Sequence, residues 1–542
     1  MREHEKFSTR PITLLHYILL ALVLAVVAYV RIRLLTVPLE RDEGEYAYLG
    51  QLLLKGMPPY VAAYTMKLPG VGIAYALIML LFGQTPAGIH IGLLIVNGIC
   101  ICLVYLLARR LLERDPAIIS CASFAVLSLS QSVFGVFAHA THFVVMFSLS
   151  GFILLLRHLD RGKLAMLFFS GLSFGLAFTM KQHAILLITF AFLYLLWRGR
   201  DKFPAGKKHF TAGCVLFLLG TSIPYALLVI WLSKAGAFAR FWFWTVQYAR
   251  EYASGPSLPT GLFNLVMSLT RLRPEFPLWL LGVTGFALMF TSQKSRTDRP
   301  FVFGFLLFSF LAVCPGFYFR EHYFVMMLPA VAILAGFACS CAGRLLSFWQ
   351  PAIHVRYAPI FIITATIGSG LYLEKGYLFT LTPDEVSRTL GGTNPFPEAL
   401  QVARYLKDHT SRTDRIAVLG SEPEIYFYAD RLSATGYIYM YGLMENQPHA
   451  ERMQQEMIRE IELAGPKYVV TVNVATSWLI QPFSQRKILD WGNSYIKQAY
   501  EAVGVVEIAD SGPSNYRWDA QAAGYSPVTD SSLIIYKRKE GV

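Results

Sequence analysis

The sequence predicts an all-α polytopic membrane bundle followed by a small soluble α/β domain. Hydrophobic residues occupy 55% of the 542 positions and charged residues only 15%, whereas a soluble domain carries about 25% charged residues. Apolar runs close to the ~20 residues that cross a bilayer recur about eleven times before the composition changes. These runs lie near 13–35, 87–108, 117–136, 142–157, 164–180, 183–197, 211–232, 275–292, 300–315, 322–341 and 357–373.

The charge pattern predicts how the chain crosses the membrane. The run at 13–35 is too long for the apolar core of a cleaved signal peptide, so we expect a retained first helix. A shorter run at 69–83 is either a span or a helix at the membrane interface. Lys and Arg concentrate in cytoplasmic loops, and the basic loops share one side only if 69–83 does not span. The basic loops are 109–114, 157–163, 198–208, 294–299 and 344–356.

We therefore predict an interfacial helix at 69–83 and a multi-pass protein of the plasma (inner) membrane. Its N-terminus would be cytoplasmic and its C-terminal domain extracytoplasmic. The net charge of +13 then reflects topology and contact with membrane lipids, and no nucleic-acid partner is expected. All seven cysteines lie in or beside apolar segments, which argues against a disulfide framework.

The composition after about residue 374 is that of a soluble domain, which predicts a membrane domain at 1–374 and an extracytoplasmic α/β domain at 375–542. Strands are expected at 415–420, 467–473, 503–509 and 532–537, and a helix at 449–463. Alternating strands and helices are typical of an α/β layer. This part has neither a Gly-rich phosphate loop nor a nucleophile elbow, and 420–423 is interpreted as a turn.

The most informative segment is the start of the first outer loop, where Glu40, Asp42, Glu43 and Glu45 cluster just beyond the first helix. Ionisable residues at the membrane boundary are candidate functional residues. A structural role is the alternative, because Asp42 and Glu45 have the spacing of a capping box at the start of a helix. Periodicity alone favours the capping role.

The outer Asp42-Glu43 pair, the Tyr-rich segment after it and the Lys-x-Pro element at 67–69 together resemble the GT-C membrane glycosyltransferases. The similarity is greatest to the protein O-mannosyltransferase and aminoarabinose transferase group. It implies a GT-C bundle that moves a hexosyl or pentosyl unit from a polyprenyl-phosphate donor to a lipid, glycan or protein acceptor. The reaction would take place on the outer face of the membrane.

The resemblance also implies roles for individual residues. Asp42 matches the essential acidic position of the family, with Glu43 beside it, and a carboxylate there can act as the general base for the acceptor hydroxyl. Lys67 matches the lysine that faces the donor phosphate, where a cation stabilises the departing charge. Aminoarabinose transferases carry a metal-binding Glu just before that lysine, but this chain has Met66. The cofactor is therefore unknown, and a divalent metal stays an open question.

Five further side chains at the outer ends of spans are candidate site residues. His139 and His142 lie one helical turn apart and could bind a metal or phosphate, although a structural role is the simpler alternative. Arg320 could bind a phosphate through two hydrogen bonds or anchor the chain at the interface, and His322 follows it. Lys181 flanks an outer turn.

Two readings from other classes remain at this stage. A transporter or lipid flippase usually has paired repeats and ionisable residues at mid-membrane, whereas the polar residues here gather at the outer ends of the spans. A non-catalytic scaffold would leave the acidic outer loop without a purpose. The aromatic segment at 241–252 is predicted to be an amphipathic interfacial helix.

Overall fold

The computed structural model describes residues 4–202, 206–290, 298–349, 357–509 and 512–540. The chain forms two compact units, each assembled from three separate stretches. The first unit contains Met1–Leu34, His90–Leu228 and Pro256–Leu381, and the second contains Leu35–Ile89, Val229–Gly255 and Thr382–Val542. The acidic segment at 40–45 and Lys67 therefore belong to the same unit as the C-terminal residues. The predicted division at 374/375 stays a prediction.

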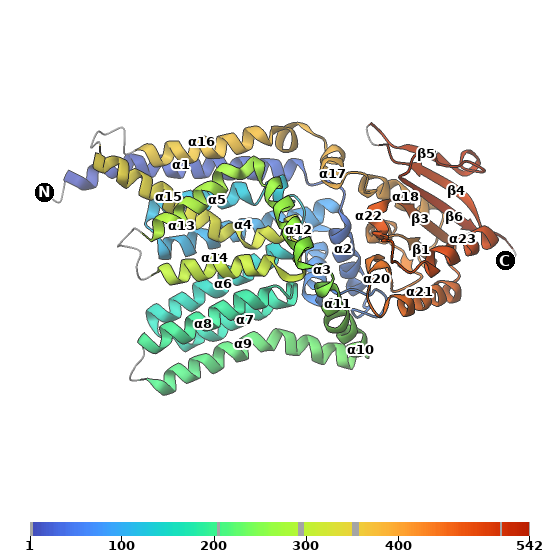
Figure 1. The fold of residues 1–542 in the computed structure, drawn as a ribbon, viewed down its shortest axis with the longest axis horizontal. Coiled ribbons are helices and arrows are strands. Elements are labelled where there is room, and N and C mark those ends of the chain that lie inside the picture. The colour runs from blue at the N-terminus through green and yellow to red at the C-terminus, as the bar shows by residue number, and fades with distance from the viewer. Residues whose placement is uncertain (1–3, 203–205, 291–297, 350–356, 510–511, 541–542) are drawn as a thin grey trace. The chain divides into compact units, whose positions relative to one another are not determined.

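The first unit is a bundle of helices, and each predicted apolar run overlaps one of them. Helix α6 packs on α7 and α8, while α5 packs on α1 and α15 (Figure 1). The long helices are α1 (His4–Arg33), α4 (Pro86–Leu111), α5 (Arg114–Leu127), α6 (Ala140–Arg161), α7 (Leu164–Met180), α8 (Ala184–Lys202), α9 (Lys207–Lys234), α12 (Leu258–Arg271), α13 (Phe276–Met289), α14 (Arg299–Val313), α15 (Leu328–Trp349) and α16 (Ala358–Leu373). Short turns are η1 (Gln131–Val133), η3 (Arg273–Glu275), η5 (Pro315–Phe317), η6 (Glu321–Met326) and η8 (Gly376–Thr380).

Small residues allow neighbouring helices of this unit to approach closely. A Cβ at Gly171 of α7 would lie 2.1 Å from the carbonyl oxygen of Phe217 in α9, and one at Gly220 of α9 would lie 2.2 Å from that of Phe168. Both separations are shorter than any van der Waals contact. Glycine is therefore required at this crossing, as is common between membrane helices.

Five helices in the described part are long and apolar enough to cross a membrane, namely Leu14–Arg33, Pro86–Leu111, Ala140–Arg161, Lys207–Lys234 and Leu328–Leu346. Five shorter apolar helices accompany them, including the one at Pro69–Phe82. The predicted number of about eleven spans stays a prediction. Parts of three predicted basic loops, 203–205, 294–297 and 350–356, lie outside the described residues.

The second unit contains a six-stranded mixed sheet in the order β2-β1-β3-β6-β4-β5 (Figure 1). Strand β1 is parallel to β2 and β3, and the other neighbours are antiparallel. The strands are β1 (Arg415–Leu419), β2 (Leu432–Ser433), β3 (Tyr468–Asn473), β4 (Tyr500–Glu507), β5 (Asn515–Trp518) and β6 (Ser532–Arg538). The four predicted strands are confirmed as β1, β3, β4 and β6. Strands β2 and β5 were missed because β2 has only two residues and β5 is half exposed.

The helices of the second unit come from all three of its stretches. Helix α2 (Arg41–Leu54) packs against α3 (Pro69–Phe82) and α19 (Pro423–Ala429). The predicted helix at 449–463 is confirmed as α21 (Ala450–Ala464). The aromatic segment at 241–252 is helical as predicted, as a π-helical turn η2 (Phe243–Tyr248) between α10 (Phe238–Trp242) and α11 (Ala249–Ser254). The others are α17 (Pro383–Gly391), α18 (Phe396–Asp408), α20 (Tyr441–Met444), α22 (Ala475–Trp478), α23 (Lys487–Ala499) and η9 (Asp519–Gln521).

Candidate active site

Helix α2 begins at Arg41, and its cap is Glu40. The Glu40 carboxylate accepts a hydrogen bond of 2.9 Å from the backbone N–H of Glu43. The capping box predicted for Asp42 and Glu45 is therefore wrong. The usual capping residues have short side chains, but here the longer Glu40 side chain accepts the bond from the N–H three residues on. The helix therefore starts two residues earlier than a cap at Asp42 would place it. Asp42 lies inside the first turn.

The Asp42 carboxylate instead forms an ion pair with Lys67, with 3.2 Å between Oδ1 and Nζ. The structure thus brings together the two residues that the resemblance selected, 25 positions apart. The Lys67 backbone is held on both sides, because its N–H donates to Thr65 Oγ1 at 3.0 Å and its carbonyl accepts from the Tyr60 hydroxyl at 2.7 Å. The Lys67 ammonium also lies 5.5 Å from the centre of the Tyr46 ring.

Glu45 is a second carboxylate beside this pair, and the sequence did not single it out as a site residue. It is 2% exposed, and the Thr65 hydroxyl donates a hydrogen bond to its Oε1. The pKa of Glu45 is raised to about 7, mainly by burial; the charge of Lys67 lowers it and the charge of Asp42 raises it within that total. Its spacing of three residues from Asp42, on one helix face, was the available signal. Glu43, the other predicted catalytic residue, is completely buried.

Close packing holds α2 in place. A Cβ at Gly44 would lie 2.7 Å from the Cβ of Glu424 in α19, and one at Gly50 would lie 2.9 Å from the backbone nitrogen of Ala76 in α3. Side chains at either position would push the helices apart. The site residues therefore sit on a helix whose position is fixed on two sides.

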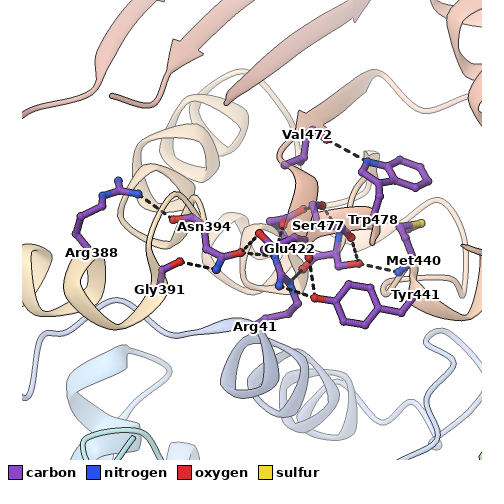
Figure 2. Close-up of polar contacts among 12 residues, drawn as sticks. Arg41, Arg388, Gly391, Asn394, Glu422, Met440, Tyr441, Val472, Ser477 and Trp478 are labelled. Carbon is purple, nitrogen blue, oxygen red and sulfur yellow. Dashed lines mark hydrogen bonds and ion pairs between the residues drawn. The ribbon is translucent and has the colours of Figure 1, made fainter. Parts of the chain in front are cut away.

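Arg41, the neighbour of Asp42, anchors the start of α2 to the residues that follow β1 (Figure 2). Its guanidinium donates to the Ser421 carbonyl at 2.6 Å, the Tyr441 hydroxyl at 2.8 Å, Asn394 Oδ1 at 2.8 Å and Glu422 Oε1 at 2.9 Å. The interpretation of 420–423 as a simple turn is therefore incomplete. Sequence reasoning missed this network because its members are more than 350 positions from Arg41.

In the first unit the structure groups three of the other candidates around Tyr323. The imidazoles of His139 and His322 are stacked with 4.1 Å between ring centres and 15° between planes. The ring of His322 lies 4.8 Å from that of Tyr323, and the Lys181 ammonium lies 4.0 Å from the centre of the Tyr323 ring. Turn η6, the start of α6 and the end of α7 supply His322, His139 and Lys181 to this grouping.

The remaining two candidates, His142 and Arg320, are close to these residues in the sequence but make different contacts. His142 is buried in the first turn of α6, and its N–H donates to the His139 carbonyl at 3.0 Å. Arg320 precedes η6, and its guanidinium lies 5.6 Å from the centre of the Tyr318 ring. His139 and His322 could supply two ligands to a metal. Which metal, if any, the protein uses is left open, as the sequence left it.

Comparison of the fold with solved structures decides the fold class. The archaeal oligosaccharyltransferase AglB of Archaeoglobus fulgidus, solved with an inhibitory peptide and a dolichol-phosphate, superposes with a TM-score of 0.56 at 14% identity, over 97% of this chain and 76% of that one. ArnT of Cupriavidus metallidurans bound to undecaprenyl phosphate gives a TM-score of 0.55 at 14% identity, over 95% of this chain and 97% of that one. The chain has the GT-C fold.

Sequence comparisons agree with this GT-C assignment over the N-terminal part. The family described as dolichyl-phosphate-mannose-protein mannosyltransferase matches residues 45–225, a stretch that includes Lys67, His139, His142 and Lys181 but begins after Asp42. An undecaprenyl phosphate-alpha-4-amino-4-deoxy-L-arabinose arabinosyl transferase of Pseudomonas aeruginosa (strain UCBPP-PA14) is 26% identical over 223 residues, or 39% of this chain and 40% of that relative. The same enzyme of strain LESB58 is 29% identical over 227 residues.

The GT-C chain thus matches about two fifths of the length of these curated relatives. The relatives are sugar transferases, so the transporter or flippase alternative is not supported. The GT-C fold together with the apolar helices makes the chain a multi-pass integral membrane protein.

Proposed function

We propose that this GT-C chain is a glycosyltransferase that moves a sugar from a polyprenyl-phosphate donor to a lipid, glycan or protein acceptor. The observation that carries the proposal is the ion pair between Asp42 and Lys67 at 3.2 Å. It joins an acid and a cation on packed elements of a fold shared with proteins solved with dolichol-phosphate and undecaprenyl phosphate.

The reaction is a direct displacement at the anomeric carbon. The acceptor oxygen forms a bond to that carbon while the bond between the carbon and the phosphate oxygen breaks, and the polyprenyl phosphate leaves with the electron pair. The acceptor hydroxyl proton passes to the Asp42 carboxylate, which acts as general base. A single displacement inverts the configuration at the anomeric carbon.

Lys67 has two partners in turn in this scheme. Before the donor binds, its ammonium pairs with Asp42. The donor phosphate then takes that place, so that Lys67 stabilises the growing charge on the leaving group and Asp42 becomes available as the base. Arg320 is a further candidate for binding the donor phosphate. The other candidate site residues, which would lie around the reacting groups, are Glu43, His139, His142, Lys181 and His322.

The proposed setting is the outer face of the plasma (inner) membrane. The chain would cross it about eleven times, with a cytoplasmic N-terminus and an extracytoplasmic C-terminal domain. A periplasm-active phosphatase fused after the last residue tests this topology: activity is expected, and a fusion that is active only in the cytoplasm would contradict it.

Transfer is tested with the purified full-length protein in lipid nanodiscs. Undecaprenyl phosphate carrying a radiolabelled pentose or hexose serves as donor, and a bacterial envelope extract that retains its lipids serves as the pool of acceptors. We expect label to move to the extract and undecaprenyl phosphate to accumulate in equal amounts. Lys67→Ala should lower both, whereas Lys55→Ala, which removes a lysine of another ion pair in the same unit, should lower neither.

Two outcomes would contradict the proposal. One is movement of intact donor across a bilayer without its cleavage, which would indicate a transporter or flippase. The other is the absence of any product with every donor sugar while the protein stays folded, which would indicate a scaffold.

A further inference from the structure

Glu45 is a buried carboxyl group beside the pair of Asp42 and Lys67, and the proposed chemistry assigns it no role. It follows Asp42 by three residues on α2, which places both side chains on one face of the helix. The residue is 2% exposed. Its contacts show whether it serves packing alone or also serves the site.

One oxygen of the Glu45 side chain holds the segment that carries Lys67. Its Oε1 accepts a hydrogen bond from the hydroxyl of Thr65, which is 5% exposed. Because that hydroxyl donates its one proton to Glu45, its oxygen acts as an acceptor toward other groups. It accepts the backbone N–H of Lys67 at 3.0 Å. Glu45 therefore orients Thr65, and Thr65 orients Lys67.

The backbone of Lys67 is held on its other side as well. Its carbonyl accepts a hydrogen bond of 2.7 Å from the hydroxyl of Tyr60, a residue that is 1% exposed. With its backbone fixed by these two bonds, Lys67 places its ammonium 3.2 Å from the Asp42 carboxylate. Loss of the bond from Thr65 would remove one of the two constraints. The position of the ammonium thus depends on Glu45 through Thr65.

The second oxygen of Glu45 indicates which charge state the side chain adopts. Oε2 is buried and has no hydrogen-bond partner among the residues that the structure describes. A buried carboxylate with so few donors is poorly stabilised as an anion. Burial accordingly raises the pKa of Glu45 to about 7, although the charge of Lys67 opposes the shift. At pH 6 the side chain is therefore mostly a neutral carboxylic acid, whose carbonyl oxygen still accepts the Thr65 hydroxyl.

Two charged groups act on Glu45, namely Asp42 on its own helix and Lys67. The helices packed against α2 present their titratable groups to other residues of α2. Tyr75 of α3 packs edge-on against the aromatic residue that follows Glu45, with 5.5 Å between ring centres. Glu424 of α19 lies against the glycine that precedes Glu45. The charge balance around Glu45 is therefore set by Asp42 and Lys67.

Ionisation of Glu45 changes that balance from neutral to negative. With Glu45 uncharged, the ammonium of Lys67 is matched by the single charge of Asp42. With Glu45 ionised, two carboxylates surround one ammonium, and they repel the phosphate of a donor, which is itself an anion. Only the uncharged form of Glu45 lets the phosphate take the place of Asp42 at Lys67.

We infer that Glu45 is a positioning residue: through Thr65 it fixes Lys67 for the donor phosphate, and it does so as an uncharged carboxylic acid. The inference rests on the proposed function for the identity of the ligand at Lys67. It adds to that function a second carboxyl group whose protonation controls how tightly the donor binds.

Binding is measured on the full-length protein in nanodiscs of phosphatidylcholine, with farnesyl methyl phosphate as the probe and empty nanodiscs as the blank. This phosphodiester keeps one negative charge from pH 6 to pH 8.5, so any pH dependence comes from the protein. We expect the wild type to bind about tenfold more weakly at pH 8.5, the factor that corresponds to one unit of pKa. Glu45→Gln keeps the acceptor oxygen and cannot ionise, so it should bind at both pH values like the wild type at pH 6.

The matched control is Glu451→Gln, which removes the same charge from an exposed position on α21. It should keep the pH dependence of the wild type. Thermal unfolding of each variant is recorded beside the binding, so that affinities refer to folded protein. A wild type that binds equally well at both pH values, or the same pH dependence in wild type and Glu45→Gln, would overturn the inference.

Substitutions of Thr65 test the positional part of the inference. Thr65→Val keeps the shape of the side chain and removes the hydroxyl, so it should bind the probe about three- to tenfold more weakly at pH 6. Thr65→Ser restores the hydroxyl and should bind like the wild type. Wild-type affinity in a folded Thr65→Val variant would show that this hydroxyl does not position Lys67.

The transfer assay separates a failure of this inference from a failure of the proposed function. In Glu45→Gln the donor concentration for half-maximal transfer should lose its pH dependence, while the maximal rate stays near that of the wild type because Asp42 remains as the base. If the wild type binds the probe as expected but transfers no sugar, the proposed function fails and the role of Glu45 stands. If Glu45→Gln transfers sugar with the pH dependence of the wild type, the role of Glu45 fails and the proposed function stands.

Discussion

Arg41 and Asp42 are consecutive residues of α2 that form two different kinds of ion pair. Arg41 pairs with Glu422 at 2.9 Å, with side chains 8% and 0% exposed, and its guanidinium has three further hydrogen-bond partners. Asp42 pairs with Lys67 at 3.2 Å, with side chains 12% and 19% exposed. Arg41 and Asp42 are themselves almost equally buried, at 7% and 8%. The difference lies in their partners, because Glu422 is fully enclosed whereas Lys67 is the most exposed of the four side chains.

The largest effect is expected for Asp42→Asn. The substitution keeps the size of the side chain and removes the base, and general-base catalysis typically contributes about 10²–10⁴ in rate. Because Glu40 caps α2, folding should be almost unaffected. Turnover per folded molecule, with thermal stability measured beside it, checks this, and wild-type turnover in a well-folded variant would remove Asp42 from the mechanism.

Arg41→Met should affect stability. Removing one partner of a buried pair leaves the other charge uncompensated, at a cost of about 3–5 kcal/mol. The double variant Arg41→Met/Glu422→Gln should recover part of this loss, since neither charge of the pair is then left without its partner. Denaturation of the three proteins in the same detergent measures the difference, and equal stability of Arg41→Met and wild type would contradict the structural role.

A smaller, pH-dependent effect is expected for Glu45. Burial raises the pKa of this carboxyl from 4.5 to about 7 in the folded protein, so the folded state binds the proton more tightly than the unfolded state. Stability from this group is complete below pH 4.5 and is lost as the pH rises through 7, by up to about 3 kcal/mol. Glu45→Gln should therefore lose less stability than the wild type between pH 5 and pH 8. An equal change in melting temperature between pH 5 and pH 8 in the wild type and in Glu45→Gln would contradict this.

The smallest effect is expected for the pair of Lys55 and Asp430 in the same unit. Its atoms are 2.7 Å apart, but the two side chains are 31% and 30% exposed. Pairs of this kind contribute about 0–1 kcal/mol. Asp430→Asn should thus change neither turnover nor stability measurably, which makes it the matched control for Asp42→Asn. A large loss of turnover in this control would mean that loss of any acidic charge in the unit lowers activity.

Much of the fold could be predicted because it depends on neighbouring residues. Runs of apolar side chains predicted the helices of the first unit, and buried β-branched runs predicted β1, β3, β4 and β6. The start of α2 was harder, since the spacing of Asp42 and Glu45 fitted a capping box equally well. Only the geometry decides that Glu40 accepts the bond from Glu43.

The sequence by itself predicted the apolar helices and the small sheet, and through a family resemblance it selected Asp42 and Lys67 as candidate site residues. The tertiary structure alone decided what surrounds them: the Arg41 network and the raised pKa of Glu45. The physical reason is the range of the interactions. Periodicity and capping act over a few residues, whereas Arg41 and Glu422 are 381 positions apart and meet only when the chain has folded.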